Sequence, residues 1–258
     1  MIKKMVIYVL LLGAAPSTAY ADPFVQAAGE GRIIITGLHT NSPTGFGDNG
    51  KVIDIPDYHQ DQVYFQAEYG LTNNLTLLAT PSYQGVDVNG TDKTSGLGYT
   101  DIGARYRIFH DDNWTVSLQG LVRIPGVKRA DRAAQVGRTD AEYDMRAGVG
   151  YSFGSSFISL EGGYRLRAGD PPNEFHADFT IGTRLTSRLM LMVASYNTFS
   201  DGRGINVFNQ VYRYDDVYPS LVYDITKHFS VQAGYFATFS GRNALRQRGP
   251  ALGLWVKF

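Results

Sequence analysis

Ionised side chains recur at every second position in several segments that are otherwise apolar. On a β-strand such positions share one face, so each segment would present a charged face and an apolar face. Burying so many charges in a dry core would carry a prohibitive desolvation cost. We therefore expect them to line a water-filled lumen, at Glu68, Asp101, Arg105, Arg107, Arg123, Glu142, Asp144, Arg146, Glu161, Arg165, Arg167, Asp178, Arg184 and Asp224.

Two interpretations of these charges stay open. They could form a polar pore whose constriction orients a hydrophilic solute, as rings of charge do in channels. They could equally form a salt-bridged network that fills and stiffens a narrow barrel without conducting. Because the two signs are roughly balanced, we do not expect strong ion selectivity.

Other residue patterns that could support chemistry are sparse. Glu174, His176 and Asp178 would share one strand face, but no second histidine lies near them in register, so we expect no metal site. No serine is paired with a histidine in the way that nucleophilic catalysis requires. Gly96-Leu97-Gly98 with Gly103 is not followed by a helical pattern, so it is not a phosphate-binding loop. We expect no catalytic residues and no cofactor.

Apolar residues occupy the opposite faces of the same segments. Val116, Leu118 and Phe179 are examples. Strands of a membrane barrel alternate in this way, with apolar side chains turned toward lipid and polar ones toward the lumen. Aromatic residues near the ends of several segments suit a girdle at the lipid interface, at Tyr69, Trp114, Tyr151, Phe153, Phe199, Tyr223, Phe229, Phe239 and Phe258.

The alternating segments number about twelve, and their connections are long and short in turn. We expect long loops at residues 41–61, 84–98, 125–139, 169–173, 200–210 and 241–248, with tight turns between them. In an up-and-down meander every second connection lies on the same rim. Short periplasmic turns and longer external loops are typical of the outer membrane. The sequence predicts an all-β, antiparallel, up-and-down transmembrane β-barrel.

The two ends of the chain carry export and assembly signals. Residues 1–21 place Lys3 and Lys4 before an apolar run and end on Ala19-Tyr20-Ala21, the order of a secretory signal peptide. We expect residues 22–258 to form the barrel, with residues 22–31 as a short periplasmic lead-in. The last strand ends on an aromatic residue and resembles the terminal strand that the barrel-assembly machinery reads in bacterial outer-membrane proteins, through Leu252, Leu254, Val256 and Phe258.

The amino-acid composition indicates which classes of binding partner to expect. The 258 residues carry 24 basic and 24 acidic side chains and no cysteine, so nucleic-acid binding is not expected and disulfides cannot stabilise the exported chain. We expect outer-membrane lipid, the assembly machinery and a small solute as partners of a monomer.

Two segments resemble a known group of barrels. Residues 69–77, YGLTNNLTL, and 98–107, GYTDIGARYR, are similar to strand motifs of the outer-membrane barrels grouped with the phenol-degradation meta-pathway protein and the XagA-type surface-attachment proteins; Gly29-Glu30-Gly31 is also similar. The resemblance implies a barrel that acts as a transporter or an attachment factor. No functional residue of that group maps to a position here.

Three functions follow as hypotheses. The first is a channel for small hydrophilic or aromatic solutes. The second is a structural or surface-attachment protein that acts through residues 41–61, 84–98 and 125–139. An outer-membrane enzyme is the third and the least supported by the residues.

Overall fold

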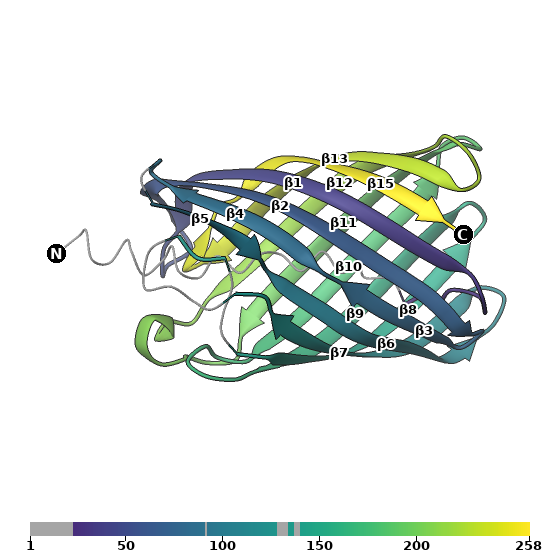
Figure 1. The fold of residues 1–258 in the computed structure, drawn as a ribbon, viewed down its shortest axis with the longest axis horizontal. Helices are drawn as coiled ribbons and strands as arrows, with labels where there is room; N and C mark the ends of the chain where they lie inside the picture. The colour runs from purple at the N-terminus through teal and green to yellow at the C-terminus, as the bar shows by residue number, and fades with distance from the viewer. Residues whose placement is uncertain (1–22, 91, 128–133, 137–139) are drawn as a thin grey trace.

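The computed structural model describes residues 23–90, 92–127, 134–136 and 140–258. The predicted signal peptide lies outside the described residues. Nearly all of the described chain is β-strand, wound into one barrel of strongly tilted strands (Figure 1). Among the described residues, no helix has the length and apolar character needed to cross a bilayer.

The strands follow one another in hairpins. They are β1 (Gly31–Phe46), β2 (Val52–Thr72), β3 (Leu75–Thr80), β4 (Ser82–Val88), β5 (Asp92–Leu97), β6 (Tyr99–His110), β7 (Trp114–Pro125), β8 (Glu142–Phe153), β9 (Ser156–Arg167), β10 (Glu174–Arg184), β11 (Leu189–Ser200), β12 (Arg213–Asp224), β13 (Phe229–Arg242), β14 (Ala244–Leu245) and β15 (Arg248–Lys257), with a 3-10 turn, η1 (Asn206–Phe208), before β12.

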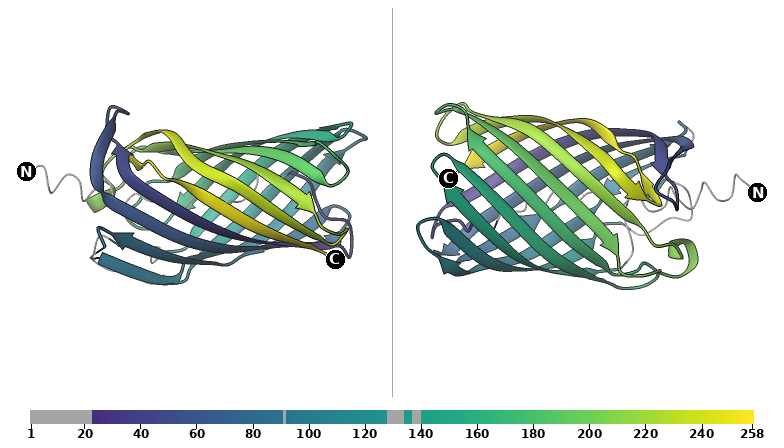
Figure 2. Two further views of the ribbon diagram at one scale, coloured as in Figure 1. Left: turned by 90° about the horizontal axis from the view of Figure 1, so that it is seen from above. Right: turned by 180° about the vertical axis from the view of Figure 1, so that it is seen from behind.

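Three positions in the barrel wall are each filled by two short strands. β3 and β4 both pair with β2 and are separated by Pro81, which has no N–H to donate. β5 and β6 together fill the next position, where β5 pairs with β4 and β6 pairs with β3. β14 and β15 fill a third position, and both pair with β1. The wall therefore has twelve positions, and β1 closes it by pairing with β2 on one side and β15 on the other (Figures 1 and 2). The predicted antiparallel barrel of about twelve strands is confirmed.

The two faces of the wall differ as the alternation predicted. Leu118 and Phe179 are 49% and 38% exposed on the outside, whereas Arg105 and Glu142 are each 3% exposed. Large apolar side chains cover the outer surface of every part of the wall, and aromatic residues such as Trp114, Phe239 and Phe258 are exposed there. This outer surface matches the hydrocarbon core of a bilayer.

Two predicted loops are strands instead. Residues 41–61 belong to β1 and β2, which pair from Gly31 to Phe46 and are joined by a turn in which the Gly47 N–H donates to the Lys51 carbonyl at 2.9 Å. Residues 84–98 belong to β4 and β5, joined at Asn89 and Gly90, which both have positive φ. Beyond the bilayer both faces of a strand can be polar, so these hairpins lack the alternation that identifies a strand.

Two further expectations need correction. β13, β14 and β15 take up most of residues 241–248, which were expected to form a loop. Within the described part of the expected periplasmic lead-in, residues 23–26 lie inside the barrel instead, where Pro23 is buried, whereas residues 27–30 are exposed at its end. The short turns at residues 73–74, 111–113, 154–155, 185–188 and 225–228 lie at one end together with Phe258, and we call this end the periplasmic rim (Figure 2).

Candidate functional site: the lumen

A continuous series of ion pairs crosses the inner face of β6 to β10. Acidic and basic members alternate as far as Arg146, which two further carboxylates share, and each guanidinium contacts at least two carboxylates. We call it the ion-pair belt, and it runs through Asp101, Arg123, Glu142, Arg167, Glu174, Arg165, Asp144, Arg146, Glu161 and Asp178.

The geometry of the belt is close at every step. Arg123 Nε lies 2.8 Å from Asp101 Oδ1, and Arg167 Nη1 lies 2.6 Å from Glu174 Oε1. The side chains are nearly inaccessible to water, with Arg146 1% exposed. A buried charge is tolerated when it is paired and hydrogen-bonded, and losing one partner then costs about 3–5 kcal/mol. The belt is therefore a fixed part of the wall.

Arg146 is the most heavily shared residue of the belt. Its Nε lies 2.8 Å from Asp144 Oδ1, while its Nη1 lies 2.9 Å from Glu161 Oε1 and 2.8 Å from Asp178 Oδ2. These carboxylates come from β8, β9 and β10. The inward positions of three neighbouring strands converge there, because residues directly opposite in an antiparallel pair lie close together.

A second, smaller cluster lies near the periplasmic rim. Glu68 of β2 accepts from Arg32 at 2.7 Å and from Arg105 at 3.3 Å. Arg105 Nε also donates to Gln119 Oε1 at 3.1 Å. This cluster is where the start of the described chain meets the wall.

We call residues 23–30 the N-terminal segment; residues 23–26 lie against the inside of the wall, and residues 27–30 are exposed at the periplasmic rim. Arg105 Nη1 donates to the Phe24 carbonyl at 3.0 Å, and the Gln26 side chain donates to Glu68 Oε2 at 2.7 Å. The Gln26 and Ala28 N–H groups donate to Thr76 Oγ1 and Asn73 Oδ1. The segment thus occupies part of the periplasmic half of the lumen.

Glycines in the wall make room for this segment. A Cβ on Gly70 would lie 2.0 Å from the Ala27 carbonyl oxygen, and a Cβ on Gly150 would lie 2.7 Å from the Phe24 ring. Real Cβ atoms do not approach other heavy atoms so closely. The wall of β2 and β8 is therefore shaped to accept the segment.

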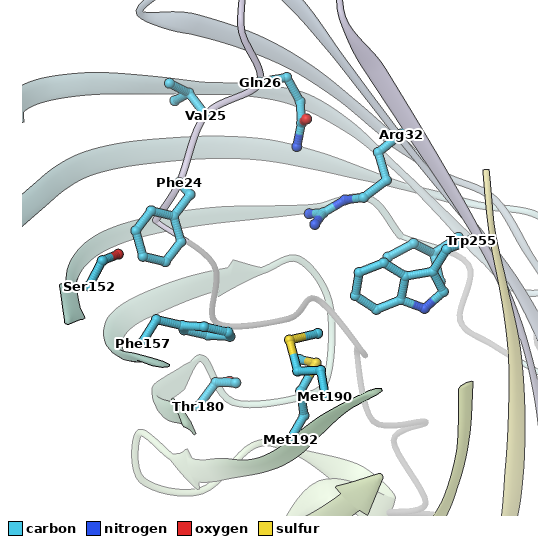
Figure 3. Close-up of a pocket in the computed structure, with 11 residues that line it drawn as sticks. Phe24, Val25, Gln26, Arg32, Ser152, Phe157, Thr180, Met190, Met192 and Trp255 are labelled. Atoms are coloured by element: carbon cyan, nitrogen blue, oxygen red, sulfur yellow. The ribbon is translucent and has the colours of Figure 1, made fainter. Parts of the chain in front are cut away.

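A cavity of about 380 Å³ lies between the N-terminal segment and the wall (Figure 3). Most of its lining is apolar or aromatic. The lining residues are Phe24, Val25, Gln26, Arg32, Ile34, Ser152, Phe157, Thr180, Met190, Met192 and Trp255.

The opposite mouth of the barrel is packed with apolar side chains. Ala134 and Val136, from the connection between β7 and β8, lie against Tyr58, Val86 and Leu245. The Ala134 N–H donates to Asp92 Oδ2 at 3.0 Å, which attaches this connection to the β4–β5 hairpin. Both ends of the lumen are thus partly filled by segments that are not strands.

The structure places the predicted lumen residues in three groups. Nine of them belong to the belt, namely Asp101, Arg123, Glu142, Asp144, Arg146, Glu161, Arg165, Arg167 and Asp178, and Glu68 and Arg105 belong to the rim cluster. The other three lie at the periplasmic rim: Arg107 donates to the Asn73 carbonyl at 2.6 Å, and Arg184 pairs with Asp224 at 2.8 Å in a partly exposed position.

Sequence reasoning missed several inward-facing residues. Glu174 and His176 were expected on the same strand face as Asp178 but were not among the predicted lumen residues, yet Glu174 joins two arginines of the belt. Arg32 was not singled out. Asp216 is 2% exposed and has no ion-pair partner among the described residues. Its position on the inward face of β12, two residues from Tyr214 and Tyr218, is a signal that could have found it. Among the described residues, no three His, Cys, Asp or Glu side chains are arranged to hold a metal ion.

The last strand lies at the seam of the barrel. The Gly31 and Phe258 backbones exchange two hydrogen bonds, of 2.7 and 3.0 Å. Leu252, Leu254 and Phe258 point outward and are exposed, whereas Ala251 and Trp255 point inward and are buried. The residues proposed as an assembly signal therefore form one outer stripe along this seam.

Solved structures similar to this chain are outer-membrane barrels. An outer membrane channel from Pseudomonas putida F1 matches with a TM-score of 0.77 and 14% identity over 95% of this chain and 98% of that chain. The translocator domain of the autotransporter NalP from Neisseria meningitidis matches with a TM-score of 0.58 and 11% identity over 90% of each chain. The NanC porin matches with a TM-score of 0.54 and 11% identity over 86% of this chain and all of that chain.

These likenesses share the fold, and with the apolar outer surface they place the protein in the bacterial outer membrane. No curated protein matches the chain. A family model described as "Putative MetA-pathway of phenol degradation" matches residues 52–258, which is most of the chain and includes both motifs noted in the sequence. The chain belongs to this family of phenol-degradation MetA-pathway proteins.

Proposed function

We propose that the protein is an outer-membrane channel that passes small hydrophilic or aromatic solutes through its lumen. The observation that carries the proposal is the polar part of the inner wall, which lies beside the apolar inward side chains of β1 and of β11 to β15. Gln60 and Gln84 face inward near the outer end, and Thr76, Ser117 and Ser230 do so near the periplasmic rim. A barrel that served only as a scaffold would not need a polar path along its axis.

We further propose that the N-terminal segment closes this path at rest. The segment is not a strand of the wall, and hydrogen bonds from Arg105, Gln26 and Ala28 fix it. Each such bond contributes a net stabilisation of about 0.5–1.5 kcal/mol. The segment can therefore leave the wall without unfolding the barrel, whose strands are paired independently of it.

The belt sets the expected electrical behaviour. Its four guanidinium groups face six carboxylates, and the rim cluster adds Arg32 and Arg105 against Glu68, so the two sites together hold six basic and seven acidic groups and neither sign dominates strongly. We expect weak discrimination between cations and anions.

Planar-bilayer recordings and liposome swelling test the proposal. The purified barrel should show brief openings, and a variant lacking residues 23–28 should show longer openings and faster solute entry. If neither protein conducts or admits solutes while both remain folded, the channel proposal fails.

A surface-attachment role has one observation in its favour. The β1–β2 and β4–β5 hairpins extend the wall beyond the bilayer as ordered strands and so present a rigid surface (Figure 1). Shortening β1–β2 at residues 44–54 in cells would separate the two roles. Loss of adhesion with unchanged conductance would favour attachment, and unchanged adhesion would count against it.

A further inference from the structure

We propose that the cavity between the N-terminal segment and the wall is a binding site for a compact, uncharged aromatic molecule that carries one hydroxyl group. The idea that a transported solute pauses in this cavity rests on the proposed channel function. The idea that the cavity binds such a molecule rests on the cavity alone.

The size of the cavity suits such a molecule. Ligand-binding cavities typically measure about 300–1,000 Å³, and a cavity of about 150 Å³ lined by apolar side chains accepts benzene. The cavity here measures about 380 Å³. It can hold a substituted single ring or two fused rings.

The lining favours an aromatic ring over a sugar or an aliphatic chain. Met190 and Met192 place two thioethers on one side, and sulfur makes favourable contacts with aromatic rings (Figure 3). Phe24 and Phe157 meet edge to face, with ring centroids 5.8 Å apart. Aromatic rings prefer such offset or perpendicular partners, so a further ring can pack beside this pair.

Trp255 forms a rigid wall of the site. Its indole N–H donates to Gln232 Oε1 at 2.9 Å, and the Arg32 guanidinium lies 5.4 Å from the ring centroid. Gln232 is itself held by Ser220 at 2.8 Å. The indole is therefore positioned before any ligand arrives, which lowers the ordering cost of binding.

Thr180 supplies the polar contact. Its side chain lines the cavity and is 1% exposed, and its Oγ1 has no hydrogen-bond partner among the described residues. A buried hydroxyl without a partner is costly, so a ligand hydroxyl that reaches Thr180 gains more than the bond alone.

An aromatic carboxylate fits less well. The cationic group at the cavity, Arg32, is already 2.7 Å from Glu68 Oε2 and also lies against Trp255. A ligand carboxylate would have to approach Arg32 beside the Glu68 carboxylate. The two negative charges would then lie next to each other and repel.

The site also connects binding to the position of the N-terminal segment. Phe24, Val25 and Gln26 of the segment form one side of the cavity. A ligand that packs against Phe24 stabilises the seated segment, whereas one too large for the cavity displaces it.

Tryptophan fluorescence offers a direct test. The chain has two tryptophans, and Trp114 lies on the outer surface, so Trp114→Phe leaves Trp255 as the reporter inside the cavity. The probe is 4-bromophenol, whose bromine quenches indole fluorescence on contact. Phenols ionise near a pH of about 10, so the probe is uncharged at neutral pH.

We expect saturable quenching of Trp255 by 4-bromophenol. Thr180→Val should weaken this binding about fivefold, as loss of one hydrogen bond implies, and should leave the binding of bromobenzene unchanged. Thr183→Val is the matched control, because Thr183 lies on the same strand, bonds to Ser156 and does not line the cavity. It should bind both probes as the parent does.

Three results would overturn the inference: quenching that does not saturate, equal affinities for 4-bromophenol in the Thr180→Val and parent proteins, or tighter binding of 4-bromobenzoate than of 4-bromophenol. Equilibrium binding needs no transport. A barrel that binds the probe but never conducts would refute only the channel proposal, and one that conducts without binding would refute only the site. For each variant, the heat-modifiable electrophoretic mobility of the folded barrel shows whether the protein is folded.

Discussion

Arg105 of β6 donates a hydrogen bond from Nη1 to the backbone carbonyl oxygen of Phe24, 3.0 Å away and 81 positions earlier in the chain. The same guanidinium contacts Glu68 of β2. One side chain thus joins the N-terminal segment to two strands of the wall. If the N-terminal segment closes the lumen to solutes, replacing Arg105 should change how often the lumen opens.

We predict that Arg105→Gln makes the channel open more often. The shorter amide cannot reach both Phe24 and Glu68, so the seated segment loses about 1 kcal/mol or more of stabilisation. Single-channel recordings should show a severalfold rise in open probability. Arg107→Gln is the control, since Arg107 faces the same way two residues on but contacts Asn73 and Asn74 at the rim. Equal behaviour of the two variants would contradict the prediction.

A second prediction concerns the fit of the segment to β2. In Gly70→Ala the new methyl group would lie 2.0 Å from the Ala27 carbonyl oxygen, so the segment must move away. Amide exchange at Gln26, Ala28 and Gly29 should accelerate by about tenfold, because their hydrogen bonds break.

Gly37→Ala is the matched control for that exchange measurement. Gly37 lies in β1, and a Cβ there meets no atom within 4 Å. Exchange in the N-terminal segment should be unchanged. Unaltered exchange in Gly70→Ala as well would show that the segment is not seated as described.

A third prediction concerns the belt. Arg146→Met leaves three buried carboxylates without their shared cation, which should cost about 3–5 kcal/mol of folding free energy. Arg184→Met breaks a partly exposed pair with Asp224 and should cost about 0–1 kcal/mol. Urea unfolding of the barrel in lipid measures both. A small loss in Arg146→Met would mean that water reaches the belt.

The fourth prediction compares two charge reversals. In Arg123→Glu a third carboxylate joins Asp101 and Glu142 in a buried part of the wall. In Arg242→Glu the new charge lies near Asp48 on an exposed hairpin, where water screens it. We expect Arg123→Glu to change conductance or folding far more. Equal, negligible effects in bilayer recordings and unfolding curves would argue against a charged lumen.

A fifth prediction concerns assembly at the seam. Phe258 is 57% exposed and its backbone bonds to Gly31, so Phe258→Ser should keep the seam geometry but remove the terminal aromatic group of the outer stripe. If the assembly machinery reads that stripe, the folded fraction in cells should fall severalfold, as judged by heat-modifiable mobility. Refolding of the purified chain into detergent should be nearly unaffected. An undiminished yield in cells would remove Phe258 from the signal.

The membrane-spanning part of the fold could be predicted from the sequence because the bilayer imposes a period of two. Segments such as Glu142–Phe153 and Glu174–Arg184 alternate without interruption, and the structure has strands there. Outside the bilayer that constraint ends. Residues 41–46 and 52–61 are strand but carry no alternation of polar and apolar side chains, and each depends on pairing with the other strand, which a single segment does not reveal. The Asn89-Gly90 pair was the local signal for the second missed hairpin, since both residues readily adopt positive φ.

The site was less predictable than the wall. Alternation shows that Asp144 and Arg146 face inward, but not that Arg146 reaches across to Asp178 on β10. The cavity depends on Phe24 and Trp255, which lie at opposite ends of the chain and come together only when the barrel closes. Nothing in the local pattern of residues 23–26 indicates that they enter the lumen.

The sharing of one guanidinium among Asp144, Glu161 and Asp178 has an evolutionary consequence. Replacement of Arg146 alone leaves these buried carboxylates without their shared cation in a water-poor place, so we expect descendants to keep the guanidinium for as long as the three carboxylates are present.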